Sequence, residues 1–243
     1  MTRHTLFLLG VAALAASCAR PRGFDRGQLA SDLSQVALVT DEDIRKALEL
    51  HPQLPKPFRL GVLFKQARTE RYARGWSWQP EDKEALLQAG ENLKRAGVVS
   101  DVAWVSAAIA GSDELKAIRL AEAQHGADAV LIVGGVAETD RYNNVLGPSY
   151  ALLVTPFFVP GTVIDGLFVA QAALWDVRNG FLYASSEVDA RSRITRPAYF
   201  AREPDAIARA KRDAVEKLAA DVERRVRSLA VEPAGAAGSG GER

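Results

Sequence analysis

The first half of the chain alternates short apolar runs with segments of helical periodicity. Residues 58–64, 102–105 and 129–136 are apolar runs of strand length. Between them, residues 80–97 and 111–126 carry apolar side chains at helical spacing, and each segment ends at a glycine, which favours the end of a helix. This order of strand, helix, strand, helix, strand predicts an α/β layer.

The second half has apolar runs without a helix between them. Residues 150–158 and 162–176 are both strand-like. The Asn179-Gly180 pair is typical of a type I′ turn, because both central residues of that turn need positive φ angles. It predicts an antiparallel hairpin that pairs residues 168–177 with residues 181–188.

A long helix is predicted over residues 204–229. Ile207, Ala214 and Leu218 lie on one stripe of this helix, with charged side chains elsewhere. The predicted fold class is therefore α/β: a mixed sheet with a β-α-β-α-β first half, an antiparallel β-hairpin in the second half, and a long C-terminal helix packed on the sheet.

The chain is expected to contain one α/β domain, over residues 58–229. We interpret residues 1–17 as a lipoprotein signal peptide, and residues 18–57 as a lipidated tether, a short helix and a Pro-rich connector. Residues 230–243 are rich in Gly and Ala and are expected to form a disordered tail.

The short helix of this connecting region is expected to begin after Thr40. Asp43, three residues later, resembles the partner residue of a capping box. Ile44, Ala47 and Leu48 share one face, so we expect the helix to cover the main domain.

Cys18, the only cysteine, indicates where the protein resides. It follows an apolar run that is opened by Arg3 and His4 and closed by small residues, which is where a bacterial lipoprotein signal places its acylated cysteine. The run is too short to span a bilayer stably, whereas each acyl chain adds about 0.8 kcal/mol per buried CH₂. Ala19 follows in place of the aspartate that retains lipoproteins at the inner membrane, so we expect an outer-membrane lipoprotein that faces the periplasm.

The signal departs from the usual lipoprotein pattern at one position. Leu14 stands four residues before the cysteine, and Ala15 holds the place three residues before it that leucine usually takes. The alternative is an ordinary secretory signal cleaved after Ala15, which leaves Cys18 as a free thiol. An unpaired thiol is a liability in an oxidising compartment, which favours lipidation.

Composition limits the classes of partner. The chain has 31 basic and 30 acidic residues, and removal of residues 1–17 takes away only Arg3, which leaves 30 of each. A neutral mature chain has no electrostatic footprint for nucleic acid or anionic lipid. The 48% hydrophobic content is enough for one sizeable core, whose stability must come from packing because one cysteine cannot form an internal disulfide.

The order of elements resembles a known group of envelope proteins. The strand Gly126-Ala127-Asp128-Ala129-Val130-Leu131-Ile132-Val133, followed by the hairpin segment Ala172-Ala173-Leu174-Trp175-Asp176-Val177-Arg178-Asn179-Gly180 and a long helix, looks like the rhombotarget lipoproteins. The resemblance covers residues 58–229. The layout is more distantly similar to the amino-terminal domain of TolB, to penicillin-binding-protein activator lipoproteins and to the curli-secretion lipoprotein. It implies a periplasmic lipoprotein without catalytic activity of its own.

The sequence offers little support for catalysis, and we expect no cofactor. His4 leaves with the signal and His51 lies in the connector, while His125 ends a predicted helix, where it favours the negative end of the helix dipole. A metal centre or a cysteine nucleophile therefore has no support. Asp165 and Asp176 would serve a hydrolase if they faced each other across a groove, but we favour the interpretation that they are a turn residue and a hairpin residue.

An aromatic loop over residues 68–78 is the first candidate contact surface. It interleaves arginines with aromatic side chains, the residue types that dominate binding hot spots. We predict partner contacts from the following residues: Arg71, Tyr72, Arg74, Trp76 and Trp78. In the alternative interpretation, Trp76 and Trp78 fold back onto the core and the arginines are solvated.

The nearly uncharged segment 149–170 is the second candidate. Its prolines and Asp165 argue against a membrane-spanning helix, since they would leave backbone groups unpaired in lipid. We expect a buried hairpin with an apolar tip, in which Phe157 and Phe158 dock a partner. A hairpin that joins others in an oligomeric pore is the alternative.

These patterns favour a noncatalytic, membrane-anchored protein-binding or assembly module of the bacterial cell envelope, with an envelope protein as partner. The first alternative is a subunit of an oligomeric outer-membrane pore or secretion assembly. The second is an envelope hydrolase that uses Asp165 or Asp176. The long C-terminal stripe also offers a surface for self-association, so a homo-oligomer is a further expectation.

Overall fold

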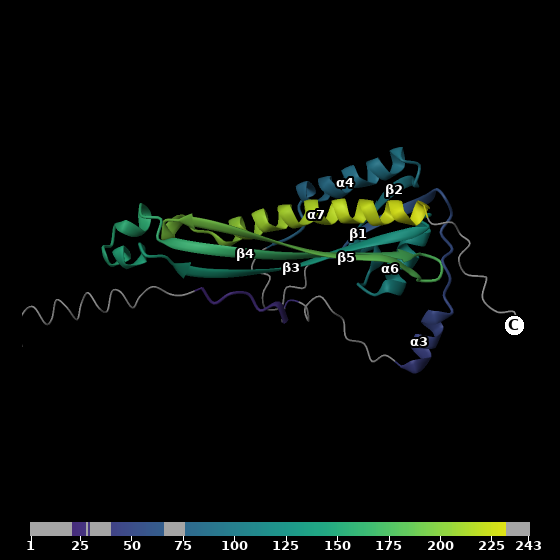
Figure 1. The fold of residues 1–243 in the computed structure, drawn as a ribbon, viewed down its shortest axis with the longest axis horizontal. Coiled ribbons are helices and arrows are strands. Elements are labelled where there is room, and N and C mark those ends of the chain that lie inside the picture. Colours follow the sequence, from purple (N-terminus) through teal and green to yellow (C-terminus); the bar gives the residue numbers. More distant parts are fainter. Residues whose placement is uncertain (1–20, 28, 30–39, 66–75, 232–243) are drawn as a thin grey trace, which may run out of the picture.

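The computed structural model describes residues 21–27, 29, 40–65 and 76–231, and its centre is one five-stranded mixed sheet (Figure 1). The strand order is β2-β1-β3-β4-β5. The first three strands are parallel to one another, and β4 and β5 add an antiparallel hairpin. The strands are β1 (Phe58–Phe64), β2 (Val99–Val105), β3 (Ala129–Asn143), β4 (Thr162–Asp176) and β5 (Leu182–Arg196).

Helices cover the two faces of the sheet unequally. The long helix α7 lies along one face with α4 beside it, and α6 covers part of the other face (Figure 1). The helices are α3 (Asp41–Leu48), α4 (Pro80–Arg95), α5 (Ala107–Ala110), α6 (Leu115–Gln124) and α7 (Glu203–Val231), with short 3₁₀ turns η1 (Gly147–Ala151), η2 (Thr155–Phe157) and η3 (Ala198–Phe200). This architecture confirms the predicted fold class.

The main core lies between α7, α4 and the sheet. Small side chains of α7, such as Ala210 and Ala214, let the helix approach the sheet closely, and Leu218 is fully buried among them. On the strands, Phe168 and Leu174 of β4 face the same core. The apolar stripe predicted for the C-terminal helix therefore packs as expected.

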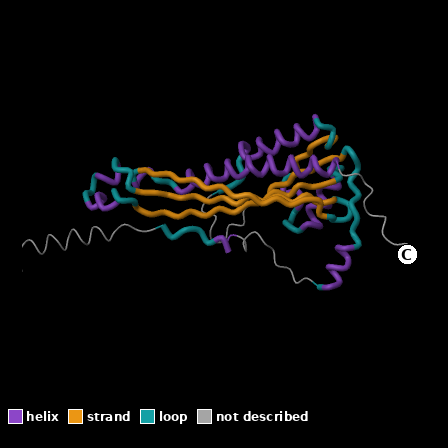
Figure 2. The backbone as a smooth tube through the Cα atoms, in the orientation of Figure 1, coloured by secondary structure: helices purple, strands orange, loops and turns teal. Residues whose placement is uncertain are grey.

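Strands β3, β4 and β5 are 15 residues each and continue past β1 and α6 to form an elongated end (Figure 2). The apolar run of 129–136 marks only the first half of β3, because the rest alternates polar and apolar residues on a half-covered face. The hairpin likewise begins at Thr162 and not at Phe168. Strand β3 and the paired part of the hairpin are therefore longer than the sequence indicated, whereas β4 has the predicted bounds of 162–176.

Two local predictions for the second half of the chain are wrong. Residues 150–158 do not form a strand but lie in η1 and η2, because three prolines in and around the segment cannot donate to a ladder. The hairpin turn is not type I′, because Gly180 alone has positive φ and Asn179 does not. Instead, the carboxylate of Asp176 accepts the N–H groups of Arg178 and Asn179 and organises a longer loop.

The short helix α3 begins with the predicted capping box between Thr40 and Asp43. It does not cover the domain, however, since none of its residues is buried. Ile44 is 51% exposed and Leu48 is 78% exposed. The apolar face of α3 is therefore unpartnered by the described residues.

Candidate contact surfaces

The end of the long strands carries a cluster of exposed apolar side chains, which we call the tip. It is built from the loop between β3 and β4, with η1 and η2, and from η3 beside them (Figure 2). No charged residue occurs from position 142 to position 164. The exposed tip side chains are Val145, Leu146, Leu152, Leu153, Val154, Phe157, Phe158, Tyr199 and Phe200.

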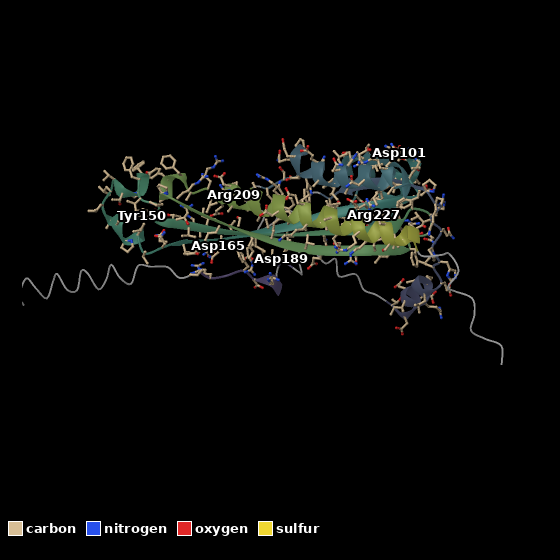
Figure 3. The ribbon with its side chains drawn as sticks, turned by 45° about the horizontal axis from the view of Figure 1, so that its top comes forward. Asp101, Tyr150, Asp165, Asp189, Arg209 and Arg227 are labelled. Atoms are coloured by element: carbon tan, nitrogen blue, oxygen red, sulfur yellow. The ribbon has the colours of Figure 1, made fainter. Side chains whose placement is uncertain are left out.

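Hydrogen bonds inside the tip hold its backbone in place. Tyr150, labelled in Figure 3, is the hub: its hydroxyl donates to the carbonyl of Val159 at 3.0 Å and accepts the N–H of Gly161 at 2.8 Å. The side chain of Asn144 donates to Pro160 O at 3.0 Å, and Thr155 Oγ1 donates to backbone carbonyls of η1 and its end. Polar side chains thus satisfy backbone groups inside the loop, and the apolar side chains point outward.

An aromatic contact joins the two parts of the tip. The rings of Phe157 in η2 and Tyr199 in η3 are stacked, with centroids 4.1 Å apart and planes 14° apart. Phe158, the neighbour of Phe157, is 79% exposed. The structure therefore presents Phe158 outward, and uses one face of Phe157 to hold η3.

The polar face of the long strands is occupied by the N-terminal segment, residues 21–27. The N–H groups of Arg22 and Gly23 donate to Asp140 of β3 at 2.6 and 2.9 Å. Further from the tip, Arg26 forms an ion pair with Asp189 of β5 at 2.7 Å. Figure 3 labels Asp189 on the side of the sheet where this segment runs. The segment therefore runs along the sheet, with its first residues nearest the tip.

Asp165 lies on the same polar face, paired with Arg193 of β5. The guanidinium donates to both carboxylate oxygens at 2.6 and 2.9 Å, and the hydroxyl of Tyr142 donates to Oδ2 at 3.1 Å. The hydrogen bonds from Arg193 hold the pKa of Asp165 below its usual value. This carboxylate is a stable anion in a structural ion pair.

Asp176 lies eleven positions along the same strand, so the two carboxylates do not face each other. At about 3.3 Å per residue, the two positions are about 36 Å apart. Asp176 is fully buried and accepts hydrogen bonds from the turn backbone and from the hydroxyl of Tyr183 at 2.6 Å. The alternative in which Asp165 and Asp176 face each other across a groove is therefore wrong, because both belong to β4.

Trp76 and Trp78, the last aromatic residues of the aromatic loop, contact the core. Trp76 is only 9% exposed, and its ring packs edge-on against Phe168 at 4.8 Å. The indole N–H of Trp78 donates to Lys65 O at 2.7 Å. The fold-back alternative therefore describes both tryptophans in this structure. The other predicted contact residues of the loop, Arg71, Tyr72 and Arg74, lie outside the described residues, as does Cys18.

His125 is the C-cap residue of α6, as the sequence predicted, and its Nδ1 lies 2.9 Å from Ala121 O. Among the described residues, no group of three or more His, Cys, Asp or Glu side chains is arranged to hold a metal ion. No helix in the same part of the chain is both long enough and apolar enough to cross a membrane.

One chemically unusual residue escaped the sequence analysis. Glu122 of α6 is fully buried, and neither carboxylate oxygen has a hydrogen-bond partner among the described residues. Burial raises its pKa to about 7, and the charge of His125 opposes this shift. The burial of Glu122 could have been predicted from the sequence, because Glu122 follows Leu115 and Ile118 at helical spacing on the apolar face of the helix.

Comparisons with known proteins give structural likeness without a family. No protein-family model and no curated protein matches the chain. Among solved structures, the chain is similar to the hypothetical protein CT253 from Chlamydia trachomatis, with 15% identity, 70% of this chain and 98% of that chain covered, and a TM-score of 0.39.

Two further similar structures are bacterial lipoproteins. The minor lipoprotein from Acinetobacter baumannii is 11% identical, with 73% of this chain and 96% of that chain covered and a TM-score of 0.34. Lipoprotein GNA1162 from Neisseria meningitidis is 16% identical, with 72% and 100% covered and a TM-score of 0.31.

Proposed function

We propose that the protein is a noncatalytic, lipid-anchored module of the bacterial cell envelope that acts by contact with other envelope components. In this proposal Cys18 carries the lipid, and the domain faces the periplasm from the outer membrane. The observation that carries the proposal is the tip, where nine large apolar side chains are exposed at one end of the domain. Exposed apolar clusters of this kind mark sites of contact with proteins or membranes.

The N-terminal segment supports the tethered arrangement. A tether that only links a domain to a lipid needs no contact with the domain, yet residues 21–27 make backbone hydrogen bonds to Asp140 and an ion pair to Asp189. The docked segment therefore limits how the domain is oriented relative to the anchor. The resemblance to rhombotarget lipoproteins, suggested by the sequence, supports the same compartment.

Two surfaces are proposed for the contacts. The tip offers Phe157 and Phe158, and the aromatic loop offers Arg71, Tyr72 and Arg74. Because Trp76 is buried against the core, the part of the loop that reaches a protein partner is proposed to lie before it.

Photocrosslinking in intact cells tests this proposal. A photoreactive amino acid is placed at Tyr72 or at Phe158, with the exposed Leu48 of α3 as the matched control position. We expect a dominant heterologous protein adduct from Tyr72 that is lost when Cys18→Ser removes the anchor. A ladder of self-crosslinks alone would contradict the proposal and favour an oligomeric pore or secretion assembly.

A further inference from the structure

The docked N-terminal segment points toward the tip. Along the polar face, Gly23 contacts Asp140, the ring of Phe24 contacts Arg191, and Arg26 contacts Asp189. In the sheet register these three contacts move step by step away from the tip. Going backward along the chain from Gly23 therefore leads toward the tip.

The length of chain before this segment places the lipid attachment near the tip. Cys18 precedes Pro21 by three residues, and a chain spans at most about 3.3–3.6 Å per residue, so Cys18 lies within about 11 Å of Pro21. Asp140 pairs with Asp165, three residues from the strand end at Thr162, which corresponds to about 10 Å. The acyl chains and the apolar tip are therefore at the same end of the molecule.

We propose that the tip inserts into the same bilayer that holds the acyl chains of Cys18, so that the elongated domain stands on the membrane at two points. This inference rests on the proposed lipid tether. It assigns the tip to lipid and leaves the aromatic loop for a protein partner. Leu153 and Phe158 are the main side chains that we expect to insert, because they are 88% and 79% exposed.

The polar groups of the tip favour lipid as its occupant. Backbone groups without hydrogen bonds are costly in an apolar medium, so a loop that enters lipid must satisfy them internally. In the tip, Tyr150, Asn144 and Thr155 provide such bonds, and its prolines have no N–H to satisfy. A protein partner would not need this internal satisfaction, since it could supply donors and acceptors itself.

The charges next to the tip indicate which lipids it needs. Arg193 is paired with Asp165, and Arg196 is paired with Asp205 at 3.0 Å. Paired cations attract anionic headgroups weakly. The insertion therefore depends on apolar contact, and we expect it equally in vesicles of phosphatidylcholine and in vesicles that contain phosphatidylglycerol.

Depth-dependent fluorescence quenching tests the insertion. Because Cys18 is the only cysteine and acylation occupies its thiol, a cysteine introduced by Val145→Cys in the tip is a unique labelling site in the lipidated protein. The lipidated chain is labelled with an environment-sensitive dye and reconstituted in phosphatidylcholine vesicles that contain a lipid-borne quencher. The matched control carries the dye through Ser228→Cys, at the exposed end of α7 far from the tip (Figure 1).

We expect quenching and a blue-shifted emission for the tip label and neither for the control label. The double substitution Leu153→Asp and Phe158→Asp changes exposed side chains, so it leaves the fold intact while it reduces tip quenching by about tenfold or more. Leu48→Asp, an equally exposed change on α3, is expected to leave quenching unchanged.

Each other outcome overturns the inference. No quenching at either label means that the tip stays in water, and a protein adduct from Phe158 in cells would then identify a protein as its occupant. Equal quenching at both labels means that the domain lies flat. Mass spectrometry of the mature N-terminus tests the tether separately. If no acyl chain is found, the proposed function fails, and the tip label is then made unique by Cys18→Ser, so that its quenching by added vesicles alone decides whether the tip inserts.

Discussion

Glu122 of α6 lies directly over Gly61 of β1, so closely that a Cβ atom on Gly61 would lie 1.9 Å from Oε2 of the glutamate. Cβ atoms essentially never lie so close to a non-bonded atom, so either the backbone at Gly61 or the Glu122 side chain would have to move. The carboxylate is fully buried and cannot move into solvent without displacing its neighbours. The absence of a side chain at Gly61 therefore provides the space that Glu122 fills.

The first prediction concerns this pair. Gly61→Ala is expected to lower the free energy of unfolding by about 1–3 kcal/mol, because overpacking forces a shift of the helix or the side chain. In the background of Glu122→Ala the same substitution should cost much less, since the clashing atoms are gone. Denaturant unfolding of both single variants and the double variant measures the coupling, and strictly additive costs would contradict the contact.

The second prediction concerns the charge of Glu122. The pKa of Glu122 is about 7 in the folded protein, whereas its ordinary value, which applies to the unfolded chain, is 4.5. Protonation of Glu122 therefore favours the folded state. The stabilisation is complete below about pH 4.5 and is lost as the pH rises to about 7, with a total of about 3 kcal/mol. Glu122→Gln cannot ionise, so its free energy of unfolding should change less between pH 5 and pH 8 than that of the parent.

Chemical unfolding at pH 5, 6, 7 and 8 measures this difference. The exposed Glu91→Gln on α4 is the matched control and should follow the pH profile of the parent. Identical profiles for Glu122→Gln and the parent would show that the carboxyl gains no stability from protonation.

The third prediction concerns Trp76, which the sequence favoured as a contact residue. Its ring packs on Phe168 and Trp78, and the amino group of Lys211 lies 5.8 Å from its centroid. Trp76→Ala is therefore expected to destabilise the fold by about 3–5 kcal/mol. Thermal unfolding measures this loss. Unchanged stability would show that the indole does not support the core and is available to contact a partner.

The fourth prediction concerns a buried ion pair between α4 and α7. Lys211 donates to Asp82 at 2.5 Å and to Ser77 O at 2.7 Å, and both charged side chains are less than 10% exposed. Lys211→Met leaves a buried carboxylate without its cation and should cost about 3–5 kcal/mol of unfolding free energy. Lys46→Met, in an exposed pair with Glu42, should cost less than about 1 kcal/mol. Equal costs in denaturant unfolding would contradict the role of burial.

The parts of the fold that the sequence predicted well are those with strong local signals. The apolar strands β1 and β3 and the capping box at Thr40 follow from residue pattern and spacing. The second half of β3 was missed because it leaves the continuous apolar run and crosses a half-covered face, where the polar Asp140 is held by a docked segment. That segment lies about 120 residues away in the sequence, and no local pattern reports such a contact.

The contact surfaces show the same limit. An apolar uncharged segment with Phe157 and Phe158 was recognisable as an exposed tip, but its 3₁₀ turns depend on the hydrogen bonds of Tyr150 to residues nine and eleven positions away. For Trp76, composition alone does not distinguish a binding aromatic from a core aromatic. The contact with Phe168, more than ninety residues later, decides it.

The fifth prediction concerns Tyr150, because its hydroxyl closes the tip between Val159 and Gly161. Tyr150→Phe keeps the ring and removes the hydrogen bonds of the hydroxyl, so the Gly161 N–H retains only its tight-turn bond to the Val159 carbonyl. Protection of the Gly161 amide from hydrogen exchange should therefore fall by about tenfold, while global stability changes by about 1 kcal/mol or less. Tyr199→Phe is the matched control, since the ring that stacks on Phe157 remains. If exchange at Gly161 is unchanged, the hydroxyl does not hold the loop. If exchange rises as expected, the variant also leaves the Val159 carbonyl with the Gly161 N–H as its one remaining donor among the described residues, which should weaken insertion of the tip into vesicles without any change to its apolar surface.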